Sequence, residues 1–177
     1  MSAADRLRAI EAKRSRLIDR VSGLEPARLT RRPGPEKWSI LEIVEHLVLA
    51  ETDVFGDLDT LGERRSRRRQ PRDRLLYPLV MFILRFGIPV RVPSQGMVPR
   101  GERRLDELRA EWEANHARLG AWIRASDPGS LERPLFVHPV AGPMTTTQTL
   151  KMLDVHLGRH DRQIMAILEA TPSPDIG

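Results

Sequence analysis

Apolar residues recur at three- and four-residue steps through the first twenty residues of the chain. The recurring positions are Leu7, Ile10, Leu17 and Val21. This spacing puts the apolar side chains on one face of a helix. Gly23 follows directly and is a common helix end signal. The pattern predicts a helix over residues 3–22.

Two later segments have the same periodicity and open on a capping box. The two boxes are Ser39 with Glu42 and Thr145 with Gln148. In a capping box the side chains of both residues bind backbone N–H groups that the first turn leaves free. These signals predict two helices, over residues 39–61 and 146–169.

A fourth amphipathic segment, residues 102–124, ends before Asp127-Pro128-Gly129. The stretch that follows it is rich in proline, so a short extended pair is the most that we expect there. Four such helices without an alternating strand pattern predict an all-α fold, a four-helix bundle. We expect one domain over residues 1–170 and a flexible C-terminal tail over residues 171–177.

Residues 62–101 are the least regular part of the pattern and form an apolar insertion between the second and third long helices. No charge occurs from Leu75 to Leu84. Spanning a bilayer takes ~20 apolar residues, and Pro78 and Arg85 interrupt this segment, so we expect no membrane span. We predict instead that the bundle or a second subunit covers four residues, Leu76, Leu79, Phe82 and Ile83.

The composition restricts the possible catalytic and metal-binding residues, and it says less about the binding partner. The 177 residues include no cysteine, which excludes a cysteine nucleophile and leaves His, Asp and Glu as metal ligands. The net charge is +5, but the arginine run 64–69 is expected to be a solvated loop. Aromatic residues are 5% of the chain, so we expect no nucleic acid partner. The charged N-terminus is unlike a signal peptide, so a cytoplasmic location is expected.

Three histidines are the candidate chemistry. His156 and His160 are four residues apart, on the apolar side of the last helix, and His46 lies in an earlier helix. Residues i and i+4 share a helix face, and bundles build metal sites from inward side chains of facing helices. The alternative is that neighbouring carboxylates satisfy these histidines. Zinc or nickel suits such a site best, and iron, manganese or copper also fits.

Other polar residues have weaker patterns. We expect His116 to lie on the surface, and His138 to lie in a turn or over the site mouth. Glu45, Glu51 and Asp53 are expected to be solvated, unless one supplies a carboxylate to the site. Asp154 and Asp161 fall away from the histidine side of their helix.

The residues also form a recognisable pattern. It reads Trp38-Ser39-x-x-Glu42-x-x-x-His46-Leu47, then Gly142-x-x-Thr145-x-x-Gln148, then His156-x-x-Arg159-His160-x-x-Gln163-Ile164. This order resembles the DinB-like (DinB/YfiT) superfamily, in its DinB_2 branch. The resemblance implies a four-helix bundle, often a homodimer, in which three histidines, here His46, His156 and His160, hold a divalent metal.

The resemblance also implies an activity. Relatives include enzymes that use a low-molecular-weight thiol, among them bacillithiol transferases and a mycothiol-dependent maleylpyruvate isomerase. We therefore expect a metal-dependent thiol S-transferase acting on a small molecule, or a hydrolase. Two other functions stay open: a metal- or ligand-binding bundle without catalysis, and an interaction module that uses residues 75–90 at an acidic membrane surface. Segment 64–98 is longer and more apolar than is usual in the family.

Overall fold

The computed structural model describes residues 1–55, 58, 70–88 and 95–170. The four long helices are α1 (Ala3–Ser22), α3 (Ile40–Phe55), α6 (Leu105–Ala125) and α8 (Thr146–Ala170). They confirm the all-α class, and the predicted boundaries that fall in described residues are correct to within three residues. The predicted helix end at Leu61, the arginine run 64–69 and the tail 171–177 lie outside the described residues and stay predictions.

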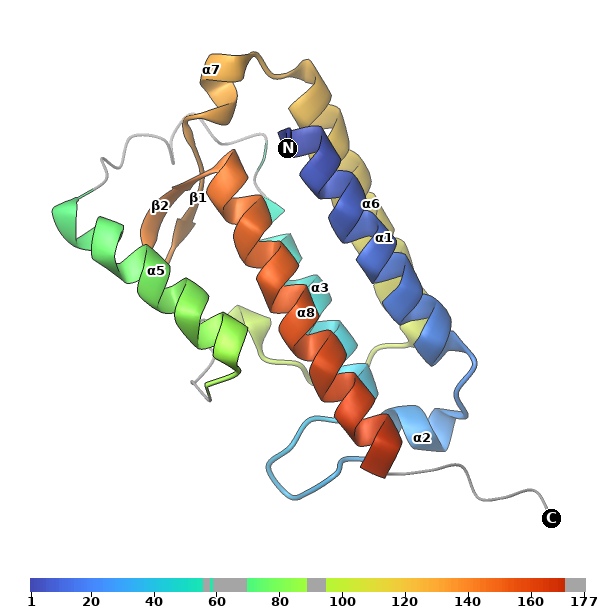
Figure 1. Ribbon diagram of the computed structural model, residues 1–177. Helices are drawn as coiled ribbons and strands as arrows, with labels where there is room; N and C mark the ends of the chain where they lie inside the picture. Colours follow the sequence, from blue (N-terminus) through green and yellow to red (C-terminus); the bar gives the residue numbers. More distant parts are fainter. Residues whose placement is uncertain (56–57, 59–69, 89–94, 171–177) are drawn as a thin grey trace.

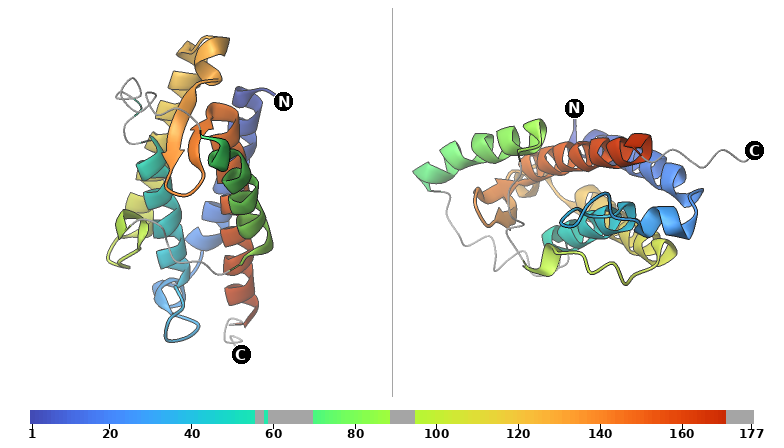
Figure 2. Two further views of the ribbon diagram at one scale, coloured as in Figure 1. Left: turned by 90° about the vertical axis from the view of Figure 1, so that its left-hand side faces the viewer. Right: turned by 90° about the horizontal axis from the view of Figure 1, so that it is seen from below.

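The four long helices surround one core. Helix α1 contacts α6 and α8, and α3 contacts the same two helices. Figures 1 and 2 show the four running side by side, and we call them the bundle. Their facing stripes meet in a set of fully buried side chains, which includes Ile10, Leu17, Ile43, Leu47, Leu108, Trp112, Leu119, Leu150 and Ile164.

Both predicted capping boxes are present. The Glu42 carboxylate accepts from the Ser39 N–H at 2.8 Å, and Ser39 Oγ accepts from the Glu42 N–H at 3.2 Å. At the start of α8, Gln148 Oε1 accepts from the Thr145 N–H at 3.1 Å, and Thr145 Oγ1 accepts from the Gln148 N–H at 3.3 Å. The boxes fix where α3 and α8 begin, and these two helices carry the three histidines.

We expect Ser39→Ala to lower the free energy of unfolding by about 1 kcal/mol, because the α3 cap is lost. In a chain of this size the melting midpoint should then fall by roughly 2–4 °C. Ser2→Ala is the matched control and should cost less, since Ser2 caps α1 in an exposed capping box, where water can replace the lost hydrogen bond. Thermal denaturation measures both variants. An equal fall of the melting midpoint in the two would contradict the assignment of Ser39 as the more important cap.

The apolar insertion contains a helix that the sequence analysis did not predict, α5 (Pro71–Phe86). Asp73 starts it by accepting from the Gln70 N–H at 2.8 Å, and Pro71 occupies the first turn, where its missing N–H costs nothing. Pro78 lies inside the helix. It removes one hydrogen bond of the ladder and crowds the carbonyl one turn before it, yet the helix continues on both sides of it.

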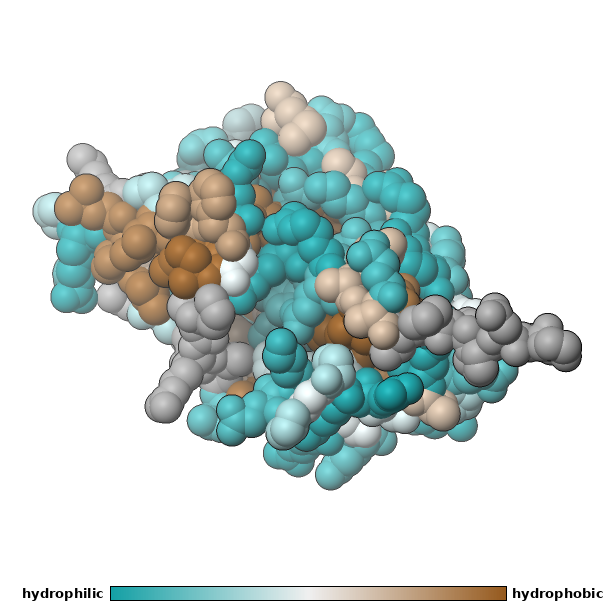
Figure 3. All heavy atoms as spheres, turned by 60° about the horizontal axis from the view of Figure 1, so that its bottom comes forward, coloured by the Kyte–Doolittle hydropathy of each residue, from teal (hydrophilic) through white to brown (hydrophobic). Residues whose placement is uncertain are grey.

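Helix α5 lies outside the bundle, along α8 and against β2. Val80 is buried, and Leu76 and Ile83 are partly covered. The bundle leaves Leu79 and Phe82 exposed at 49% and 52% of their surface, so it does not cover these two, and cover by a second subunit, the other predicted alternative, stays a prediction. With Leu75 and Phe86 they form an exposed row, the apolar stripe, and Figure 3 shows apolar side chains gathered over α5.

None of the helices that the structure describes is both long enough and apolar enough to cross a bilayer.

The proline-rich stretch before α8 forms the expected short extended pair. Strands β1 (Pro134–His138) and β2 (Gly142–Thr145) pair antiparallel, with Phe136 opposite Met144. Gly142 has φ +70°, and a Cβ there would lie 2.5 Å from Cγ of Asp73. Glycine therefore allows the hairpin to approach α5 closely. Short helices α2 (Pro26–Thr30) and α7 (Pro128–Leu131) and the 3-10 turn η2 (Gln95–Met97) complete the described elements.

Candidate metal centre

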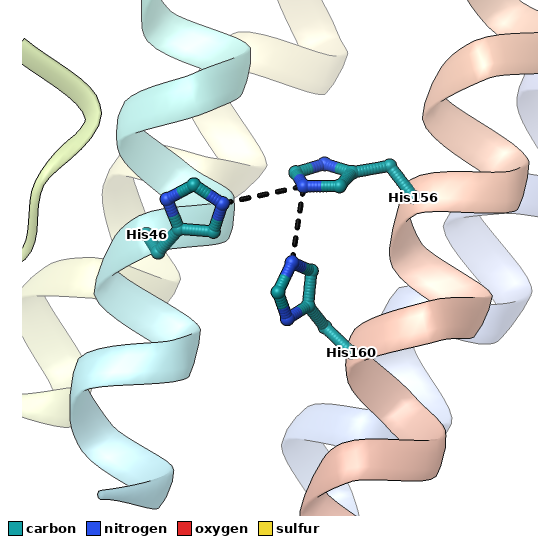
Figure 4. A group of neighbouring side chains, drawn as sticks. All are labelled: His46, His156 and His160. Carbon is teal, nitrogen blue, oxygen red and sulfur yellow. Dashed lines mark hydrogen bonds between the residues drawn. The ribbon is translucent and has the colours of Figure 1, made fainter. Parts of the chain in front are cut away.

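Three predicted histidines come together between α3 and α8. His46 projects from α3, and His156 and His160 project from successive turns of α8 (Figure 4). His156 Nε2 lies 3.2 Å from His46 Nε2 and 3.1 Å from His160 Nε2. Candidate ligand atoms of all three lie within 4.8 Å of one another. The side chains of His46 and His160 are buried, and that of His156 is half-buried.

The outer ring nitrogens fix the protonation of two of these imidazoles. His46 Nδ1 lies 2.8 Å from the Met97 carbonyl oxygen, and His160 Nδ1 lies 3.0 Å from Gln163 Oε1. Both oxygens only accept, so each Nδ1 carries the proton and each Nε2 presents a lone pair. Such outer partners orient metal-binding histidines.

Burial keeps the three imidazoles neutral. It is the largest cause that lowers the pKa of His46, and it lowers the pKa of His156 well below the usual value, with the charges of His160 and His46 adding to the effect. The pKa of His160 falls to about 3, first because of burial and then because of His46. Neutral imidazole is the form that binds a metal.

The arrangement fits a divalent ion. Two nitrogens of a tetrahedral zinc site, each ~2.0–2.1 Å from the ion, are about 3.3–3.4 Å apart. The two measured Nε2 separations, 3.2 and 3.1 Å, are close to that spacing. His156 Nε2 can carry at most one proton, so it cannot donate to both neighbouring lone pairs. A shared cation would satisfy all three nitrogens, and three protein ligands would leave an open position.

Glu45 supports the segment behind His46. Its carboxylate accepts from the Arg100 and Gly101 N–H groups at 3.1 and 2.7 Å, and Met97 lies just before them in the chain. The expectation that Glu45 is solvated is wrong, since only 3% of it is exposed. The free N–H groups of the loop need an acceptor, and a buried carboxylate at the helix surface provides one.

The predictions for His116 and Glu51 are also wrong. Both are 97% buried, and His116 Nε2 lies 2.9 Å from Glu51 Oε2, between α6 and α3. Four residues after Trp112 and three before Leu119, His116 falls on the apolar stripe of its helix, which was the signal for burial. This pair is separate from the three histidines, and Asp53 is exposed as expected.

Asp154 and Asp161 lie away from the histidines, as predicted. Asp154 pairs with Lys13 and Asp161 pairs with Arg20, so both carboxylates join α8 to α1. Neither contributes to the candidate metal centre.

A cavity of about 860 Å³ opens beside the three histidines. His138 lines it, and its Nδ1 accepts from the Val140 and Ala141 N–H groups at 3.1 and 3.0 Å. His138 is the last residue of β1, so the prediction that it lies in a turn is wrong, whereas the alternative, a place beside the site, agrees with its position in the cavity wall. Trp38 covers His46, with ring centroids 4.8 Å apart. We did not predict the places of Trp38 and Arg159 in this wall, although both belong to the recognised pattern.

Comparison with protein families gave one finding for this chain. The family model described as the DinB superfamily matches residues 9–164, a span that contains all three histidines, Trp38 and Arg159. Searches of curated proteins and of solved structures gave no match.

Proposed function

We propose that this chain, which belongs to the DinB superfamily, is an enzyme that holds a divalent metal on His46, His156 and His160 and uses a low-molecular-weight thiol in S-transfer. The observation that carries the proposal is the convergence of the Nε2 atoms, at 3.2 and 3.1 Å, in neutral imidazoles. The donor set favours zinc or nickel, with iron or manganese as further candidates.

The chain's own residues have three tasks in this proposal. The Met97 carbonyl and the Gln163 side chain orient two of the imidazoles. Trp38 and the apolar part of the cavity wall pack around the histidines. A bound divalent ion would supply an open position at which an external thiol becomes a thiolate, the competent nucleophile. The chain has no cysteine, so the thiol comes from outside, and we propose that it meets the enzyme in the cytoplasm.

The experiment measures metal content and thiol-dependent turnover. We expect purified protein to bind zinc or nickel at micromolar concentrations, and to transfer bacillithiol or mycothiol to a chlorodinitrobenzene only when metal is present. Protein that refuses both metals would contradict the proposal at its first step.

A second candidate function is a metal- or ligand-binding bundle without catalysis. One observation favours it: among the described residues, Glu36 is the only carboxylate that lines the cavity, and its side chain is exposed. A general base would need a carboxylate or another group within reach of the reacting atoms. Tight metal binding with no turnover of any thiol would support this second function over the first.

We also propose that the protein is a homodimer through the apolar stripe of α5. Leu75, Leu79, Phe82 and Phe86 follow one another at steps of four, three and four residues, which is the spacing of a helix–helix seam. All four side chains are exposed in the single chain, between 49% and 76%. A row of this kind in water is a liability unless a partner covers it.

Light scattering tests the dimer. We expect wild-type protein to be a dimer and Leu79→Asp and Phe82→Asp to be folded monomers, because each carboxylate would be desolvated in the interface. Val140→Asp is the control, since Val140 is exposed at 47% on the hairpin, outside the stripe. Dimers that persist in both stripe variants would refute this contact, and binding to anionic vesicles that the same variants abolish would assign the stripe to a membrane surface instead.

A further inference from the structure

Arg159 is a half-buried cation that has no anionic partner among the residues that the structure describes. It lies on α8, one residue before His160, and lines the same cavity. Within the described part of the chain it forms neither a hydrogen bond nor an ion pair with any carboxylate, whereas Arg162 on the same helix donates to the Arg85 carbonyl oxygen and Arg20 of α1 pairs with Asp161. Burying a charge costs free energy unless it is paired, so this position is prepared for an anion from outside the chain.

The surroundings of Arg159 are positive. Three other cations, Lys37, Arg85 and Arg162, line the cavity, and their side chains are exposed. Burial, and then the Arg162 charge, lower the pKa of Arg159, yet a guanidinium stays protonated at neutral pH. The Arg159 charge also lowers the pKa of each of the three histidines. An anion bound to Arg159 would therefore lie close to the candidate metal centre.

A further part of the wall is apolar. Val54, Phe136, Met152 and Leu153 are buried side chains that line the cavity, and Leu84 of α5 is partly buried there. Its volume of about 860 Å³ is within the range of pockets that enclose a small organic ligand, ~300–1,000 Å³. The ligand must then combine an apolar body with one negative group.

We propose that this cavity binds an amphiphilic carboxylate, with the acid group on Arg159 and the apolar body against Phe136, Met152 and Leu153. A carboxylate matches the planar guanidinium fork in two parallel hydrogen bonds. It also balances one buried positive charge, whereas a phosphate dianion would need a second buried cation. This carboxylate site would serve the proposed enzyme. It rests on the proposed function only in taking this cavity as the functional site.

The test measures ligand binding by calorimetry in chelator-treated, metal-free protein. The probes are phenylbutyrate and phenylbutanol, which share an apolar body and differ in the carboxylate. We expect wild-type protein to bind the acid at least ~10-fold more tightly than the alcohol, and Arg159→Gln to remove that preference, since a charge-assisted pair is worth roughly a factor of ten or more. Arg159→Lys should retain part of it.

Lys151→Gln is the control, because it removes one cation from an exposed position of the same helix outside the cavity lining, and it should leave both affinities unchanged. Equal affinity of wild-type protein for acid and alcohol, or an unchanged preference in folded Arg159→Gln, would overturn the proposal. The outcome is independent of the metal: His156→Ala should lose zinc and still prefer the acid, so a failed metal hypothesis and a failed carboxylate site give different results.

Discussion

His156→Ala and His160→Ala should each weaken zinc binding by a factor on the order of 1,000, which is about 4 kcal/mol. Each change removes one of three nitrogens that face a common point and leaves two ligands and additional water. Loss of an outer-shell partner alone typically costs a factor of ~10–100, so loss of a direct ligand should cost more. Competition against a coloured chelator measures the affinity.

His116→Gln is the matched control for these variants. His116 is buried like the three candidate ligands but faces Glu51 between α3 and α6. Its loss should reduce stability and leave the zinc affinity of the folded protein within a factor of about three of the wild type, well below the cost of an outer-shell partner. An equal loss of affinity in all three variants would mean that His156 and His160 are not the ligands.

The long helices could be predicted from the sequence because their local signals agree with their packing. Residues 3–22 coincide with α1, where an apolar stripe ends at Gly23, and residues 146–169 coincide almost fully with α8, where a capping box and an apolar stripe mark the same segment. Helix α5 was missed although its start signals, Pro71 and Asp73, are local. Pro78 interrupts the pattern, and the apolar row of the helix faces away from the bundle, so its periodicity does not mark a core-facing helix.

The candidate site also has a part that local sequence signals predict and a part that they do not. His156 and His160 could be paired from their spacing alone, because one helical turn fixes their relation. Their distance from His46 depends on how α3 and α8 pack, so the sequence predicted that the three meet only through the expected bundle fold and the family resemblance, not through spacing. The groups that orient the histidines could not be predicted from local sequence. The Met97 carbonyl, which contacts His46 Nδ1, lies 51 residues away from it in the chain. Glu45, which holds the following loop, looks like any exposed helix carboxylate in sequence.

The free energy of unfolding of the metal-free protein should fall steeply in acid. One cause is the lowered pKa of His160, and its contribution can be measured separately. The pKa of His160 is about 3 in the folded chain against an ordinary value of 6.5, so between these values the unfolded chain binds a proton that the folded chain does not. Stability must therefore fall as pH falls from about 6.5 towards 3. The pKa values of His46 and His156 are lowered in the same direction and add to the slope.

For His160 alone, this linkage amounts to about 2 kcal/mol between pH 7.5 and pH 5. Urea denaturation of chelator-treated wild type and His160→Gln at the two pH values measures it as a double difference. The variant lacks the titrating group, so the wild type should lose about 2 kcal/mol more than the variant does. Zinc should enlarge the acid loss in the wild type, because protons then compete with the ion for the same nitrogens. Parallel losses in wild type and variant would show that His160 is already protonated in the folded chain, and the neutral, metal-ready imidazoles of this site would have to be abandoned.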